Sequence, residues 1–177
     1  SWATSMYTAQ GAAFTGTLDG NNHTIKNISF ANLATYGSTY GIIGYLGANG
    51  TVKNLGVENM TVNRAAANRL CIGGIAGTLG NAVTVENSYV RGMSVTTTST
   101  DATYVGGIAG RTVGNEGIIK NCYATGLDFS KVTRADLKAG ILGSSGNTGY
   151  KAENCYTTDS KIQGNTSATN SYMSAVN

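Results

Sequence analysis

The residue types that most often carry catalysis are sparse in this sequence and do not cluster. His23 is the single histidine and lies near Asp19 in a segment that we expect to form a turn, where its ring would bond the backbone. The nine acidic residues offer no pair spaced for acid–base work on a glycosidic bond. The best remaining catalytic candidate is Asp128, close to Lys131 and Arg134. We therefore expect that the chain is not an enzyme.

Metal and nucleotide chemistry are also disfavoured by the residues present. The three cysteines, Cys71, Cys122 and Cys155, form no C-x-x-C pair, and one histidine cannot complete a zinc site. The run Gly73–Gly77 resembles a phosphate loop, but no lysine–threonine pair and no helix pattern follow it. We expect no cofactor and no metal.

Nucleic acid and membrane are disfavoured as partners by the composition. The net charge is +3 and the basic residues are scattered, so no nucleic-acid site is indicated. No apolar run approaches the ~18 residues that cross a membrane, so we expect no membrane insertion. The chain begins at Ser1 without a signal-peptide pattern, which we interpret as a processed chain or an excised domain.

Tyrosines at equivalent positions give the clearest indication of a binding surface. Tyr89, Tyr123 and Tyr156 each stand two residues after an asparagine, on the predicted outer side of a strand. The full column reads Ser29, Gly56, Tyr89, Tyr123, Tyr156 and, in a half repeat, Tyr172. Such a row either covers apolar surface or forms an aromatic platform for a sugar ring or a partner protein. We predict Tyr89, Tyr123 and Tyr156 as ligand-binding residues.

Basic side chains in variable segments are the second group of candidates. These segments share one place in the repeat and are expected on one side of the molecule, either as solvated loops or as a binding face. They span residues 31–39, 63–70, 96–103 and 130–138. We predict Arg64, Arg69 and Arg134 as further ligand contacts.

Internal repeats position all of these residues. A G-I-x-G box begins at Gly41, Gly74, Gly107 and Gly140, with a constant period of about 33 residues. A second box, an asparagine after a charged residue, follows each of them. Its asparagines are Asn54, Asn87, Asn121 and Asn154, which recur at nearly the same interval, with an earlier copy at Asn27 and a truncated one at Asn170. Two independent marks with one period indicate a repeat architecture.

The repeat predicts stacked coils of strands. Proline is absent, 25 glycines interrupt every window long enough for a helix, and β-branched runs such as Val83–Val85 favour strands, so ankyrin and TPR helices are excluded. Each unit should form one coil of about three short strands, stacked ~4.8 Å above the last. We expect one domain over residues 1–177, with caps at 1–13 and 165–177 and repeats over 14–164.

Stacking predicts columns of equivalent side chains. We expect four columns at consecutive positions of the repeat. The first is aliphatic and points inward, the second is charged and points outward, the third is a ladder of asparagines that bond from coil to coil, and the fourth again points inward. In that order they contain Ile25, Val52, Val85, Ile119 and Ala152; Lys26, Lys53, Glu86, Lys120 and Glu153; Asn27, Asn54, Asn87, Asn121 and Asn154; and Ile28, Leu55, Ser88, Cys122 and Cys155. Cys122 and Cys155 are either buried thiols or a vertical disulfide, for which the Cα spacing is suitable.

These boxes resemble the GLUG motif family, with isoleucine in place of the leucine: GIIG, GIAG, GIAG and GILG. The entry segment Phe14–Ile28 and the strands beginning Asn121-Cys122-Tyr123 and Asn154-Cys155-Tyr156 also resemble it. The resemblance covers about residues 14–160. It implies an all-β, right-handed parallel β-helix (solenoid) of about five coils, found in bacterial secreted or cell-surface proteins, adhesin-like proteins and regions associated with IgA-directed peptidases. The family has no assigned catalytic residues.

The function expected from residues and resemblance together is a non-catalytic binding or adhesion module, extracellular or on the bacterial cell surface. Its expected partner is a glycan or a host or cell-surface protein, beside adjacent domains of a longer chain. Two alternatives stay open: a structural spacer within a larger surface protein or secreted enzyme, and a carbohydrate-active β-helix enzyme.

Overall fold

The chain folds into short parallel strands. The computed structural model describes residues 12–31, 38–65, 68–133, 137–145 and 149–162. These residues form twenty β-strands and no α-helix, and every strand pair is parallel. The predicted all-β parallel solenoid is confirmed, while the predicted caps lie almost wholly outside the described residues.

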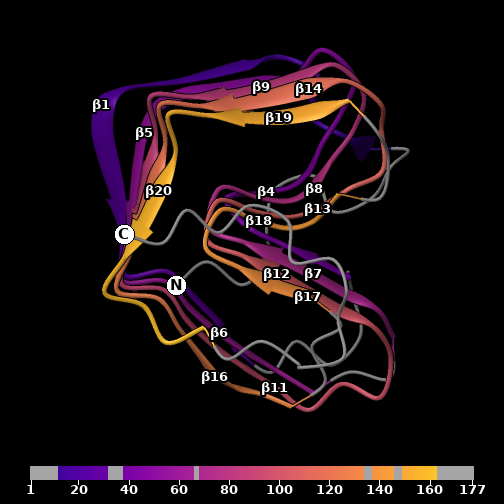
Figure 1. Cartoon of the computed structure of the whole chain (residues 1–177), viewed down its shortest axis with the longest axis vertical. Helices are drawn as coiled ribbons and strands as arrows, with labels where there is room; N and C mark the ends of the chain where they lie inside the picture. Colours follow the sequence, from indigo (N-terminus) through magenta and orange to yellow (C-terminus); the bar gives the residue numbers. More distant parts are fainter. Residues whose placement is uncertain (1–11, 32–37, 66–67, 134–136, 146–148, 163–177) are drawn as a thin grey trace.

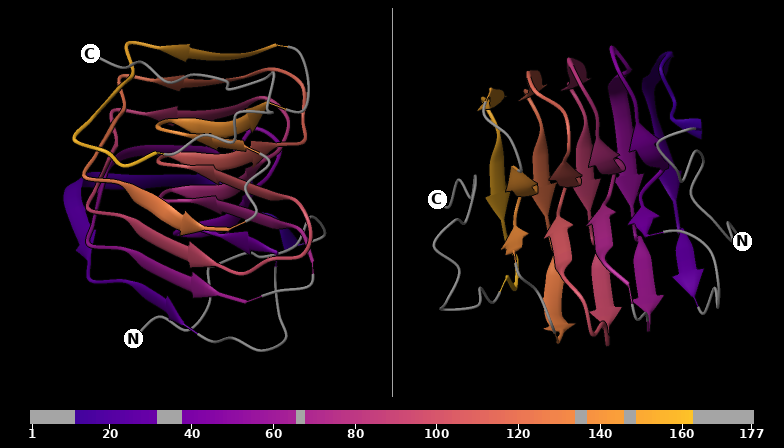
Figure 2. Two further views of the ribbon diagram at one scale, coloured as in Figure 1. Left: turned by 60° about the horizontal axis from the view of Figure 1, so that its bottom comes forward. Right: turned by 90° about the vertical axis from the view of Figure 1, so that its right-hand side faces the viewer.

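The strands follow one another as coils, four complete ones and the start of a fifth (Figures 1 and 2). The first holds β1 (Thr17–Lys26), β2 (Ser29–Ala31), β3 (Thr39–Tyr40) and β4 (Ile43–Leu46). The second holds β5 (Thr51–Glu58), β6 (Thr61–Arg64), β7 (Leu70–Gly73) and β8 (Ala76–Leu79). The third holds β9 (Val83–Glu86), β10 (Tyr89–Arg91), β11 (Ser94–Thr97), β12 (Thr103–Gly106) and β13 (Ala109–Thr112). The fourth holds β14 (Gly117–Lys120), β15 (Tyr123–Thr125), β16 (Asp128–Val132), β17 (Leu137–Ala139) and β18 (Leu142–Ser145), and the fifth begins with β19 (Tyr150–Glu153) and β20 (Tyr156–Thr158).

Each coil has five strand segments, where the sequence predicted about three. β1 and β5 each span two of these segments, which later coils split at an asparagine. In Figure 1 the C-terminal coils face the reader and the outer path runs counterclockwise through the β9 layer, β20 and the β11 layer, so the solenoid is right-handed. The two additional segments arise because the chain does not simply close the coil after the β6–β11–β16 layer but turns back into the interior.

This inward turn forms a two-layer partition across the middle of the solenoid. The layer β3–β7–β12–β17 runs inward, reverses at the G-I-x-G boxes and returns as β4–β8–β13–β18 (Figure 1). The two layers lie back to back with backbone almost touching backbone: a Cβ on Gly110 would lie 2.4 Å from the amide nitrogen of Ile72 and 2.9 Å from the carbonyl carbon of Cys71, both in β7. The box glycines therefore serve close approach. They do not supply positive φ, which among described glycines belongs to Gly92, Gly126 and Gly149.

Apolar side chains fill the space on both sides of this partition. The isoleucines of the glycine boxes, Ile42, Ile75, Ile108 and Ile141, are at most 1% exposed. The predicted inward column is confirmed for Val52, Val85 and Ile119, which are fully buried. Since each coil alone would expose this face to water, its burial between neighbours holds the stack together.

The predicted columns are confirmed from the second coil onward and are wrong for the first. Lys53 pairs in register with Glu86, and Tyr89 with both Gly56 and Tyr123. In the first coil, however, Ile25 pairs with Val57 and Lys26 with Glu58. The whole block Ile25–Ser29 therefore lies further along the coil than predicted. The reason is that Ile25-Lys26-Asn27 is equivalent to Val57-Glu58-Asn59, a second aliphatic–charged–asparagine triplet in the second coil.

The asparagine ladder runs through four coils and begins on an aspartate. The Nδ2 groups of Asn87, Asn121 and Asn154 each donate to the Oδ1 of the asparagine one coil earlier, at 3.4, 3.1 and 3.1 Å. Asn54 donates to Asp19 Oδ1 at 3.0 Å, so Asp19 replaces the predicted Asn27. All four asparagines have φ between 49° and 54°, a left-handed conformation that asparagine tolerates well. We call this turn the asparagine corner.

Asn27 belongs to a separate left-handed column at the next turn. That column contains Asn27, Asn59, Gly92, Gly126 and Asp159, with φ between 49° and 70°. Asn59 Nδ2 donates to Asn27 Oδ1 at 3.2 Å. Among the residues described above, no helix is long and apolar enough to span a membrane.

Candidate functional site

The three predicted tyrosines form one continuous stack. The rings of Tyr89 and Tyr123 are 5.1 Å apart with an interplanar angle of 4°, and those of Tyr123 and Tyr156 are 5.3 Å apart at 8°. The stack begins on Gly56, where a Cβ would lie 2.6 Å from the Tyr89 ring. Thr24 takes the first-coil position predicted for Ser29, and Tyr172 lies outside the described residues.

Contacts within the protein occupy most of the binding capacity of this stack. Each ring covers the face of the next, and Tyr89 Oη donates to Glu58 Oε1 at 2.9 Å. Arg91 lies over the Tyr89 ring and donates to Tyr123 Oη at 3.4 Å. Among the three, only Tyr156 is strongly exposed, at 46%. A sugar ring therefore cannot lie on the faces of Tyr89 and Tyr123, and their role as ligand contacts stays a prediction.

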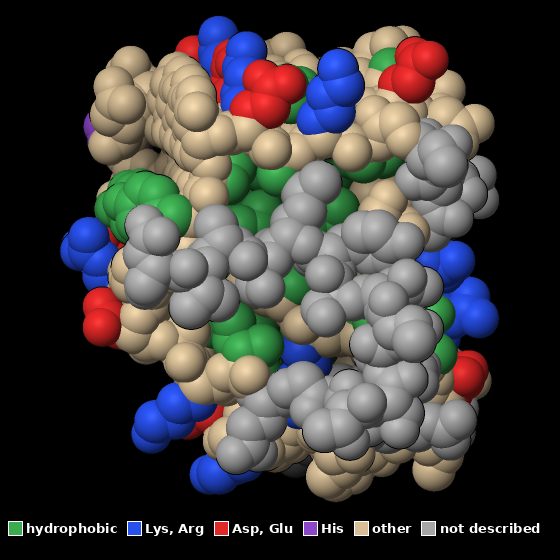
Figure 3. Space-filling view, in the orientation of Figure 1, with side chains coloured by type: hydrophobic (Ala, Val, Ile, Leu, Met, Phe, Trp, Pro, Cys, Tyr) green, Lys and Arg blue, Asp and Glu red, His purple; other side chains and the backbone are tan. Residues whose placement is uncertain are grey.

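Charged side chains beside the stack pair between coils. Glu58 bonds Lys26 at 2.8 Å and Arg91 at 3.5 Å, and Lys120 bonds Glu86 at 2.8 Å. The hydrogen bond from Lys26 is the main reason that the pKa of Glu58 lies below its ordinary value. Figure 3 shows charged side chains gathered along the outer side of the β9–β14–β19 layer. These pairs are exposed and contribute little stability individually.

The two predicted arginines that the structure describes, Arg64 and Arg69, differ in their exposure. Arg64 points inward from β6, is 9% exposed and lies 5.9 Å from the centroid of the Tyr40 ring. It pairs in register with Thr97, which is fully buried. Arg69 is exposed, and Arg134 lies outside the described residues. Arg64 is therefore a buried structural residue, because strand alternation after Val62 turns it into the interior.

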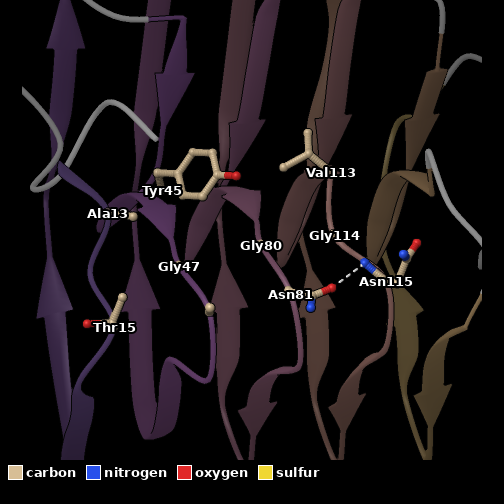
Figure 4. Close-up of a pocket in the computed structure, with 10 residues that line it drawn as sticks. Ala13, Thr15, Tyr45, Gly47, Gly80, Asn81, Val113, Gly114 and Asn115 are labelled. Atoms are coloured by element: carbon tan, nitrogen blue, oxygen red, sulfur yellow. Dashed lines mark hydrogen bonds between the residues drawn. The ribbon is translucent and has the colours of Figure 1, made fainter. Parts of the chain in front are cut away.

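A hollow that the sequence analysis missed lies at the opposite corner, where the β4–β8–β13 layer ends. We call it the corner groove; it encloses about 430 Å³ and crosses several coils (Figure 4). Its lining residues are Ala13, Thr15, Tyr45, Gly47, Ala48, Gly80, Asn81, Val113, Gly114 and Asn115. This volume falls within the ~300–1,000 Å³ typical of ligand pockets.

Glycines from successive coils line the corner groove. A Cβ on Gly114 would lie 2.3 Å from the carbonyl carbon of Gly80, and one on Gly47 would lie 2.7 Å from Ala13 Cβ. Since real Cβ atoms do not approach backbone this closely, side chains at these positions would push the coils apart. The glycines therefore allow successive coils to stack closely at this corner.

The lining combines apolar surface with amide groups and carries no charged side chain. Tyr45 and Val113 provide the apolar part; Val113 is 37% exposed, whereas Tyr45 is only 8% exposed (Figure 4). Asn115 donates its backbone N–H to Asn81 Oδ1 at 2.7 Å, which fixes the Asn81 side chain. Both asparagines are exposed, so solvent reaches their side chains.

Comparison with known protein families finds one that matches part of the chain. Residues 101–132, from β12 to β16, match the family described as the GLUG motif. The chain carries the GLUG motif. This match spans the end of the third coil and the start of the fourth, and strands of the third coil pair in parallel register with those of the second and fourth.

A curated relative matches a short part of the chain. Halomucin from Haloquadratum walsbyi (strain DSM 16790 / HBSQ001) is 46% identical over 50 residues, which is 28% of this chain and, in rounded figures, 0% of Halomucin. The chain thus spans a very small part of that relative. No solved structure matches the chain.

The histidine and acidic candidates, His23 in β1 and Asp128 in β16, make local hydrogen-bonding contacts. His23 Nδ1 lies 3.1 Å from the carbonyl oxygen of Gly20, as predicted for a turn. Asp128 Oδ1 accepts hydrogen bonds from the hydroxyl and the N–H of Ser130, which lower the pKa of Asp128. In the described part of the chain, no three His, Cys, Asp or Glu side chains come together to hold a metal ion.

The sequence did contain a signal for the corner groove. A Gly-Asn pair recurs after the glycine boxes at Gly80-Asn81, Gly114-Asn115 and Gly146-Asn147. The intervals between these pairs are close to the period of the GLUG repeat. The last pair lies outside the described residues, but the first two line the groove.

Proposed function

We propose that this chain is a non-catalytic repeat module of a surface or extracellular protein, and that it binds a neutral carbohydrate in the corner groove. The observation that carries the proposal is a groove whose lining combines two exposed asparagines with Val113 and with Tyr45, which is 8% exposed, and contains no charged residue. A sugar ring has apolar C–H faces and a rim of hydroxyl groups, so it suits this lining.

The match to Halomucin supports the surface location. Its name points to a mucin-like protein, and the resemblance of the repeats to the GLUG motif family implies a secreted or cell-surface protein as well. A module of stacked coils can present the groove at a fixed distance from neighbouring domains, since each coil adds ~4.8 Å.

The test is binding of the full chain to immobilised neutral and acidic polysaccharides. Asn115→Ala removes one amide while keeping the backbone N–H that Asn81 accepts, and Ala48→Trp fills the hollow. We expect both variants to bind the best neutral polysaccharide at least about tenfold more weakly, which corresponds to ~1.4 kcal/mol.

Two matched controls make this test decisive. Asn63→Ala removes an exposed asparagine from β6, outside the groove, and should bind as the wild type does. Tyr123→Ala breaks the tyrosine stack. Loss of binding in Tyr123→Ala with full binding in Asn115→Ala would move the site to the tyrosines. No binding of the wild type to any polysaccharide would favour the structural spacer.

A further inference from the structure

Two cysteines from successive coils lie next to each other near the C-terminal end of the described part of the solenoid. The pairing of Tyr123 with Tyr156 places Cys122 and Cys155, one residue earlier, directly above one another. Neighbouring strands are ~4.8 Å apart, inside the Cα spacing of about 4.4–6.8 Å that a disulfide requires. Both thiols are free and lie within hydrogen-bonding reach of each other.

The two thiols differ in their access to solvent. Cys122 is 1% exposed and donates to the carbonyl oxygen of Lys120 at 3.2 Å. Cys155 is partly exposed and lies 3.3 Å from the carbonyl oxygen of Glu153. The contact with Cys155 and burial raise the pKa of Cys122, whereas the hydrogen bond from Cys122 lowers the pKa of Cys155 to about 7. One thiol is therefore reachable and ionisable, and the other lies directly behind it.

Ser88 occupies the same column one coil earlier and shows what the position needs structurally. Its hydroxyl donates to the carbonyl oxygen of Glu86 at 2.7 Å, the same contact that Cys122 makes to Lys120. A serine thus suffices for the local structure. The turn alone does not explain why thiols occupy two successive coils.

We propose that Cys122 and Cys155 are a modification site, an inter-coil dithiol that a small-molecule disulfide oxidises to a covalent bond between the fourth and fifth coils. The fifth coil is the last one described and has only two strands, β19 and β20, paired with the coil below it. A bond at this position would fasten the coil with the fewest neighbours.

The reaction proceeds by two thiol–disulfide exchanges. The Cys155 thiolate attacks one sulfur of oxidised glutathione, the glutathione S–S bond breaks, and one glutathione leaves as a thiolate. Cys122 then loses its proton to the leaving group and attacks Cys155 Sγ, which expels the second glutathione. Two protein thiols lose two electrons in total, and one glutathione disulfide becomes two thiols.

The experiment treats the folded full chain with oxidised glutathione and follows mass, thiol count and melting temperature. We expect a monomer lighter by two hydrogen atoms, one thiol left of three under denaturing conditions, and a peptide map that links Cys122 to Cys155. Because the bond closes a loop of about one repeat, we expect the melting temperature to rise by roughly 5–15 °C.

Serine variants distinguish a disulfide between Cys122 and Cys155 from nonspecific oxidation of single thiols. Serine should be tolerated in this column, because Ser88 occupies the same position one coil earlier. Cys122→Ser should keep one glutathione on Cys155, because the resolving thiol is missing, and Cys71→Ser should behave as the wild type does. The proposal fails if the wild type keeps three thiols, if Cys71 enters the bond, or if the product is a disulfide-linked dimer.

Discussion

The asparagine corner and the corner groove are both turns in which each coil places one residue in a left-handed conformation, but they fill that position differently. At the asparagine corner the residue is asparagine in four successive coils, and each side chain bonds the next. At the groove the equivalent residues are Asn49, Ala82, Glu116 and Gly149, with φ of 60°, 50°, 57° and 106°. The backbone has positive φ at both corners, whereas the side chain is constant only at the first.

This difference distinguishes polar side chains that bond to one another between coils from those that are exposed to solvent. The asparagine ladder and the tyrosine stack beside it satisfy one another from coil to coil, so they stabilise the solenoid and leave little for a ligand. The corner groove leaves amides and apolar surface exposed. A repeat protein can thus divide its surface into a side that holds the coils together and a side that is free to bind.

The largest expected effect comes from breaking the ladder in its middle. Asn121→Ala removes the bonds to Asn87 and from Asn154 and places a Cβ-bearing residue without a stabilising side chain at φ 52°. We expect a loss of about 3 kcal/mol in the free energy of unfolding, from two hydrogen bonds and left-handed strain. Urea denaturation measures it.

Asn115→Ala is the matched control for this loss, since it removes an asparagine from the other corner. We expect its stability to change by less than ~0.5 kcal/mol, because the side chain is exposed. Equal losses in the two variants would contradict the division of the surface.

A smaller effect of opposite sign is expected at the groove. Ala82 is exposed and has φ 50°, which glycine adopts without strain. Ala82→Gly should therefore stabilise the chain by about 0.5–1 kcal/mol, after the entropy that glycine adds to the unfolded chain is subtracted. Asn87→Gly, the corresponding change at the asparagine corner, should destabilise it by about 1–2 kcal/mol, because two ladder bonds are lost. Thermal melts of the two variants should shift in opposite directions, and a shared direction would refute the comparison.

The smallest effect concerns the ion pairs beside the tyrosine stack. The pKa of Glu58 lies below its ordinary value of 4.5, chiefly because Lys26 and Tyr89 donate hydrogen bonds to the carboxylate. A depressed folded-state pKa stabilises the fold above pH 4.5 and loses that contribution as the pH falls through the folded value. Glu58→Gln should therefore be less stable than the wild type at pH 7 and equal to it near the acid limit. A difference that stays constant across this range would show that Glu58 acts only through packing.

Most of the fold could be predicted from the period of the sequence. Two motifs that recur with one period fix which side chains lie above one another, so the ladder, the tyrosine stack and the buried isoleucines followed directly. The first coil could not be aligned by motif alone, because Asn27 fits both Asn54 and Asn59 in local sequence. Asn27 precedes Asn54 by clearly less than one period but precedes Asn59 by nearly a full one, and this interval was the signal that pointed to the correct column.

The site was harder to predict, for a physical reason. The path of the chain within one coil is set by how closely backbones pack, as at Gly77 and Gly110, and a period does not report it. The inward partition, the five strand segments and the corner groove all depend on that path. Arg64 shows the same limit, since its loop-like sequence context concealed a strand that turns it inward.

The in-register columns bear on how proteins of this kind change length in evolution. Because every coil meets its neighbours through the same positions, duplicating or deleting one whole repeat in the gene would rejoin matching surfaces and create no new kind of contact. Unequal recombination between repeats could then lengthen or shorten the molecule in steps of one coil. Insertions of any other size would displace the asparagines and tyrosines from their partners, so selection would tend to preserve whole repeats.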